Sequence, residues 1–132
     1  MRRPDAIRNE PRWIVLCTKI RARALDFIEG RLGMFEAAQA LSKLAIWTHA
    51  RDDADLKVFT LIYGEFVGLP AGPERAHWAP DALVREDAKI RAVEARWREM
   101  AQMAAARLVE RYAWSLEARE ALRRAGGVRR DV

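Results

Sequence analysis

Cysteine, histidine and long apolar runs are scarce in this sequence of 132 residues. The single cysteine, Cys17, cannot form a disulfide within the chain, which is typical of proteins in a reducing compartment. The apolar run at 13–17 is too short for the core of a signal peptide, and no run approaches the roughly 18 residues that span a bilayer. We therefore expect a soluble, cytoplasmic protein of bacterial type.

Motifs for catalysis and for cofactor binding are also missing. The sequence has no G-x-x-x-x-G-K-[ST] loop, no G-x-G-x-x-G, no H-E-x-x-H and no C-x-x-C. Its two histidines, His49 and His77, are too few for a zinc site that needs three or four converging ligands. Cys17 lies in an apolar stripe, where burial raises the pKa of a thiol and makes it inert. The sequence predicts no metal site and no cofactor, and it favours a protein that is not an enzyme.

The acidic turn around Asp52, Asp53 and Asp55 has a structural interpretation. Asp52 or Asp53 can cap a helix, and Asp55 suits the positive end of the helix dipole. A calcium loop would need alternating oxygen ligands, a glycine and a distant bidentate glutamate, none of which follows. We therefore predict capping at this turn.

Asp87 and Glu94 border an apolar stripe, two turns apart on one predicted helix. Two carboxylates in such a position can form an acid–base site. Each also has an arginine four residues further on, Arg91 and Arg98, in the favourable orientation for an ion pair. We prefer the ion pairs.

The net charge of +5 is confined to the two ends of the chain. Residues 1–12 contain four arginines and two acids, and residues 119–132 contain five arginines and two acids. The remaining residues, 13–118, contain 15 basic and 15 acidic side chains. Because a nucleic-acid interface places its cations on the folded body, we interpret these ends mainly as solvated segments.

The apolar residues recur at helical spacing along most of the chain. They predict an all-α bundle in one domain, with four principal helices and a short C-terminal helix that Ser115 caps and Gly126-Gly127 ends. Residues 1–8 are predicted as a disordered lead, 9–124 as the helical bundle domain and 125–132 as a flexible basic tail. The predicted helices are 9–29, with Asn9 as the N-cap, then 33–50, 56–66, 80–113 and 115–124.

A long Pro/Gly-rich loop, 67–79, is predicted between the third and fourth helices. The stretch from Ile62 to Pro80 holds three of the five prolines and three of the seven glycines, yet it is apolar. A loop this long is uncommon in a compact domain unless it is functional or disordered. We predict an ordered loop that closes one end of the bundle, with Leu69 and Trp78 against the core. Glu65 is expected to hold it by accepting hydrogen bonds from backbone N–H groups or Arg75.

The run from Glu65 to Trp78 fits the pattern E-x-x-x-L-P-x-G-x-x-R-x-x-W. With the acidic turn and the run Glu36-Ala37-Ala38 at the start of the predicted second helix, it resembles a family of small, uncharacterised bacterial helical proteins over about residues 12–110. In that family the second residue after the glutamate is often acidic, whereas here it is Val67, which argues against a paired-carboxylate site. The resemblance implies a helical fold and an important loop, and it implies no established activity.

Our leading functional hypothesis is a non-enzymatic protein-interaction module, for example an immunity-type or regulatory partner. Trp47 points away from the apolar stripe of its helix, so it either anchors a partner or packs beneath the loop, and we expect the second arrangement. The residues predicted to bind are Glu65, Glu74, Arg75, His77, Trp78 and Trp47.

Two alternatives stay open. The first is a nucleic-acid-associated protein whose basic ends contact phosphates. The second is a small-molecule or metal-dependent site around Glu65, Arg75 and His77. The sequence indicates no membrane partner.

Overall fold

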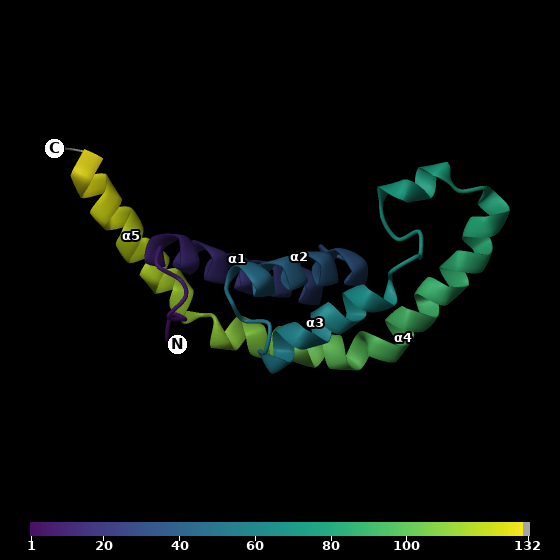
Figure 1. The fold of residues 1–132 in the computed structure, drawn as a ribbon, viewed down its shortest axis with the longest axis horizontal. Coiled ribbons are helices and arrows are strands. Elements are labelled where there is room, and N and C mark those ends of the chain that lie inside the picture. Colours follow the sequence, from purple (N-terminus) through teal and green to yellow (C-terminus); the bar gives the residue numbers. More distant parts are fainter. Residues whose placement is uncertain (131–132) are drawn as a thin grey trace.

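Helices make up all the regular structure of the protein in the range that the structure describes (Figure 1). This computed structural model describes residues 1–130, with the side chains up to residue 126. The prediction of an all-α fold is confirmed, since no strand is present among these residues. None of their helices is long and apolar enough to cross a bilayer. The elements are α1 (Glu10–Ile28), α2 (Met34–Trp47), α3 (Ala54–Glu65), the 3-10 helix η1 (Pro73–His77), α4 (Pro80–Arg111) and α5 (Trp114–Arg130).

Side-chain caps begin two of the helices. The Asn9 side chain accepts a hydrogen bond from the backbone N–H of Arg12 at 3.0 Å, and α1 starts at the next residue. The Asp53 carboxylate accepts from the backbone N–H groups of Asp55 and Leu56 at 3.0 and 3.1 Å, and α3 follows. Asn9 was predicted as a cap, and so was either Asp52 or Asp53. Both predictions are confirmed, and Asp53 is the residue that caps α3.

Four helices form the body of the protein. α1 packs against α2, α2 against α3, α3 against α4, and α4 against α1. Their apolar stripes meet in one core, where the largest fully buried apolar side chains are Phe59, Ile20, Leu41, Leu56 and Ile62. Cys17 is fully buried in this core, and burial raises the pKa of its thiol to about 12. This confirms its packing role.

α5 packs against α1 at the end of the body where the chain begins (Figure 1). The Trp13 and Trp114 rings lie 5.1 Å apart there. Contrary to the sequence prediction, α5 does not end near residue 124 but continues through both glycines to Arg130. Glycine costs about 1 kcal/mol in a helix and does not forbid the geometry. Ser115 is no cap, because it is buried and donates to the Tyr112 carbonyl at 2.6 Å.

The two predicted terminal segments can be described only in part. Residues 1–9 form no helix, and Ile7 packs partly buried against the core. Of the tail predicted at 125–132, residues 131–132 lie outside the described part of the chain.

An arm, defined here as residues 67–92, extends beyond the body. α4 is long and curved, and its N-terminal part, with the connection from α3, projects past the ends of α2 and α3 (Figure 1). Pro70 is the only buried residue of the arm. The remainder of α4 joins the core through Val93, Ala101, Ala104, Ala105 and Leu108.

Candidate functional site

The six residues that the sequence predicted to bind lie in three separate places. The connection between α3 and α4 carries Glu74, Arg75, His77 and Trp78. Glu65 is the last residue of α3, and Trp47 is the last residue of α2.

Pro70 anchors the connection to the body. It is fully buried, and Leu69 and Ala71 beside it pack partly buried against the core. Trp78 was predicted as a plug of the core, but 37% of its surface is exposed. The reason is that η1 begins three residues after Pro70 and leads the chain away from the body. Trp78 therefore lies on the arm, and the exposed His77 precedes it.

Arg75 forms an ion pair with Asp87 that links the connection to the start of α4, and we call this pair the clamp. Its guanidinium donates to both carboxylate oxygens of Asp87, at 2.6 and 3.1 Å, and to the carbonyl of Pro70 at 2.9 Å. The hydrogen bonds from Arg75 lower the pKa of the Asp87 carboxyl. The predicted ion pair between Asp87 and Arg91 does not form, because Arg75 reaches the carboxylate from the connection. One arginine thus joins the buried Pro70 to the start of α4.

Small cavities lie at the base of the arm. One measures about 250 Å³ and is lined in part by Val67 and Leu69. Another measures about 190 Å³, and Glu36, Arg75 and Glu94 are among its lining residues. Pockets for small molecules usually measure about 300–1,000 Å³. Glu94 faces the smaller cavity, and the described ion pairs do not include the predicted one with Arg98. Both cavities are too small to favour a substrate site.

Glu65 does not hold the connection, contrary to the sequence prediction. One of its carboxylate oxygens accepts hydrogen bonds from the Arg96 guanidinium and from the Trp97 indole N–H, the latter at 3.2 Å. Both donors belong to α4, so Glu65 ties the C-terminal end of α3 to α4. The sequence carries no signal for this pairing, because the residues are 31 and 32 positions apart.

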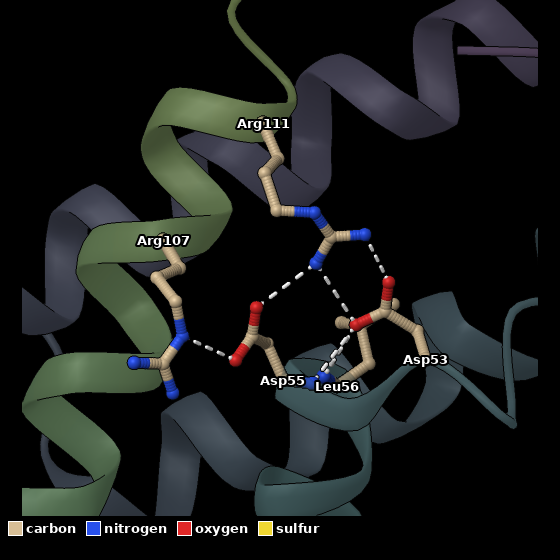
Figure 2. Close-up of polar contacts among 5 residues, drawn as sticks. All are labelled: Asp53, Asp55, Leu56, Arg107 and Arg111. Carbon is tan, nitrogen blue, oxygen red and sulfur yellow. Dashed lines mark hydrogen bonds and ion pairs between the residues drawn. The ribbon is translucent and has the colours of Figure 1, made fainter.

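The opposite end of α3 is tied to α4 by two carboxylates and two arginines (Figure 2). Arg111 donates to Asp55 at 2.9 Å and also to Asp53, while the Arg107 Nε donates to Asp55 at 2.8 Å. The side chain of Asp55 is only 9% exposed, whereas that of Arg107 is 50% exposed. The carboxylates form the inner layer of this cluster and the guanidinium groups the outer layer.

The pKa of Asp53 in this cluster is that of a carboxylate held charged by its partners. Burial raises the pKa of Asp53, but the hydrogen bonds from Arg111 and from the backbone N–H of Leu56 lower it more, so the net pKa is below 3.8. Within the described residues, no three His, Cys, Asp or Glu side chains gather to hold a metal ion. The sequence predicted a cap at Asp52 or Asp53, and it carried no signal for the pairing with Arg107 and Arg111.

Trp47 lies far from the connection. The connection packs near Phe35, at the first turn of α2, whereas Trp47 is the last residue of that helix. Trp47 was expected to pack beneath the loop, but 54% of its surface is exposed. It lines a groove of about 290 Å³ on the outer side of α1 and α2.

The structure also brings the two basic ends of the chain together. The N-terminus and α5 lie at the same end of the molecule (Figure 1). A groove of about 640 Å³ runs between the start of α1 and α5, with Arg12, Arg119 and Arg123 above an apolar floor of Pro11, Val15 and Leu122. Arg123 also faces Glu120 at 3.6 Å.

Comparison with known proteins adds no functional assignment. No protein-family model matches the chain, and no curated protein or solved structure is significantly similar to it. The candidate sites therefore rest on the chemistry and geometry of the residues described above.

Proposed function

We propose that this protein is a non-enzymatic interaction module that binds another protein through the arm. The observation that carries the proposal is the exposure of apolar side chains on a segment that is held in shape. Val67 is 77% exposed, Val84 is 70% exposed and Trp78 is 37% exposed. The Arg75–Asp87 clamp and the buried Pro70 hold the segment that presents them.

Two physical arguments favour a protein as the partner. Tryptophan, here Trp78, is one of the residue types that dominate binding energy at protein interfaces. A segment that is already shaped before binding loses less conformational entropy on association. A small-molecule ligand is disfavoured, because the cavities at the base of the arm, of about 190 and 250 Å³, are smaller than the usual pockets for metabolites. A regulatory or immunity-type partner would fit this description.

The arm can be tested with two variants and one matched control. Trp78→Ala and Val84→Asp should each reduce recovery of a co-purifying protein by about tenfold or more, as expected for central interface residues. Met100→Asp makes a similar change at a residue that is 52% exposed and outside the arm, and it should leave recovery unchanged. Quantitative mass spectrometry after native co-purification measures the effect. Equal recovery with all variants would contradict the proposal.

A second candidate function is polyanion binding at the gathered basic ends. The observation that favours it is the groove lined by Arg12, Arg119 and Arg123, which residues more than 100 positions apart build together. An arginine-lined groove suits phosphate groups, and counterion release then makes binding steeply salt-dependent.

Salt titration of binding to a double-stranded DNA fragment tests this candidate. Arg12→Ala and Arg119→Ala should each lower the slope of log K against log salt by roughly one phosphate contact. Lys57→Ala removes an exposed cation elsewhere and serves as the control. A slope that is the same in all variants, or binding without salt dependence, would exclude this role for the groove.

A further inference from the structure

A groove on the body, lined by α1 and α2 and by no residue of the arm, has the composition of a recognition site. We name it the Trp47 groove. It is a cavity of about 290 Å³ between α1 and α2. Its lining residues are Lys19, Arg23, Gln39, Ala40, Lys43, Leu44 and Trp47.

The charge of the Trp47 groove is positive and only partly balanced. Three of its lining residues are cations, and none is acidic. Arg23 faces Asp26 at 3.0 Å, but Asp26 is shared with Arg31, whose Nε lies 2.8 Å from the other carboxylate oxygen. Within the described residues, Lys19 and Lys43 form no ion pair. Two ammonium groups are therefore available to an anionic ligand.

Trp47, the exposed apolar residue of the groove, has no role in the core, whereas Leu44 in the groove lining is a buried core residue. Trp47 is 54% exposed, and Ile46 beside it is 49% exposed. α2 buries its apolar stripe on the other side, where Leu41 and Ala45 contact the core. A half-exposed tryptophan beside lysines presents an apolar surface and positive charge at one place, and tryptophan is enriched at binding hot spots.

We propose that the Trp47 groove docks a peptide segment of a partner protein in which acidic residues flank an apolar side chain. The apolar side chain would contact Trp47 and Leu44, and the carboxylates would pair with Lys19 and Lys43. The inference goes beyond the arm, because the groove belongs to α1 and α2 and shares no residue with residues 67–92.

Charge complementarity and shape favour a peptide over the other anionic partners. Single-stranded nucleic acid needs successive aromatic platforms along its path, whereas Trp47 is the only aromatic residue that lines the groove. A membrane surface needs a long apolar face along a helix. Here the exposed large apolar residues of α2 are only Ile46 and Trp47.

The test uses a fluorescently labelled synthetic peptide in which glutamates flank a Leu-Phe pair. The peptide should bind the full chain, and Trp47→Ala and Lys43→Glu should each weaken binding about tenfold. Matched controls are Leu61→Ala, at a residue that is 51% exposed on α3, and Lys57→Glu, which makes the same charge reversal there. Both controls should leave the affinity within about twofold, as expected for residues outside the contact.

Three results would overturn the inference. The first is no binding of the peptide by the unmodified chain. The second is binding that Trp47→Ala and Lys43→Glu leave unchanged. The third is Trp47-dependent binding of an oligonucleotide or of phosphatidylserine vesicles in place of the peptide. Val84→Asp, on the arm, should leave peptide binding intact, so failure of this inference is distinguishable from failure of the proposal for the arm.

Discussion

The body and the arm differ in what holds them together. The body buries large apolar side chains from four helices, including Phe59, Leu41 and Ile20. The arm, residues 67–92, buries only Pro70, and a single arginine joins its two halves. Apolar burial contributes roughly 25 cal/mol per Å², so the free energy of unfolding is concentrated in the body. The arm is held by the buried Pro70, by its partly buried neighbours and by the hydrogen bonds of Arg75, while Val67, Val84 and Trp78 stay exposed.

The polar contacts of the two regions differ as well. In the body, Asp53, Asp55 and Glu65 tie both ends of α3 to α4, and the two aspartates are nearly covered by their arginine partners. On the arm, both members of the Arg75–Asp87 pair are about one-third exposed. Water and salt weaken an exposed pair more than a covered one. The contacts of the covered Asp53 and Asp55 therefore contribute more to stability, whereas the exposed Arg75–Asp87 pair mainly fixes the shape of one surface.

The largest expected effect comes from the core of the body. Phe59→Ala removes a fully buried ring that meets Phe27 edge-on at 5.8 Å, and it should lower the free energy of unfolding by about 3–5 kcal/mol. Trp78→Ala removes a larger ring from the arm and should change the free energy of unfolding by less than about 0.5 kcal/mol. Urea unfolding followed by circular dichroism measures both. Similar losses for the two variants would remove the distinction between body and arm.

A smaller effect is expected at the Asp53 cluster. Asp53→Asn keeps a side chain that caps α3 but removes the charge opposite Arg111, and it should cost about 1 kcal/mol at neutral pH. Asp53→Ala also removes the cap and should cost about 2 kcal/mol. Urea unfolding at neutral pH gives both values. Equal costs for the two variants would show that the cap contributes nothing.

The stability difference between the unmodified protein and Asp53→Asn depends on pH in a defined direction. The pKa of Asp53 is below its ordinary value of 3.8 in the folded protein. A carboxyl with a lowered folded-state pKa stabilises the fold above its unfolded pKa, and this contribution is lost as the pH falls through the folded-state pKa. The stability difference between the unmodified protein and Asp53→Asn should therefore shrink towards zero as the pH drops below 3.8. A difference that is constant with pH would show that the charge of Asp53 is not responsible.

The smallest effect on stability, and the clearest effect on shape, is expected at the clamp. Asp87→Asn should leave the urea midpoint nearly unchanged, because the core of the body is not touched. It should instead speed tryptic cleavage after Arg75, since the guanidinium loses its charged acceptor. Glu99→Gln, at an exposed position of α4 outside the arm, is the control. Unchanged cleavage would mean that Pro70 alone holds the arm.

The interior of the body was largely predictable because its signals are local. The caps at Asn9 and Asp53 and the spacing of apolar residues act within one or two turns of a helix, and they indicated α1, α3 and the burial of Cys17. The end of α5 was predicted wrongly, because a pair of glycines lowers helix stability without ending the helix.

The candidate sites were much less predictable. The expectation that Trp47 and the loop would cover each other failed because they lie at opposite ends of α2. Arg75 was expected to donate to Glu65, but it donates to Asp87. Glu65 instead accepts hydrogen bonds from Arg96 and Trp97. Each assignment depended on which helix faces which, and the sequence pattern of one helix contains no information on its neighbour.

The amino-acid sequence by itself determined that the chain is helical, where several helices begin and which side chains enter the core, because these follow from backbone capping and helical spacing over a few residues. Only the tertiary structure decided which arginine meets which carboxylate, that Trp47 and Trp78 stay exposed, and that the two basic ends share one groove. The residues involved are 12 to 58 positions apart in the ion pairs of Arg75 and Arg111. Residues this far apart in the sequence come into contact only through the order and register in which the helices pack.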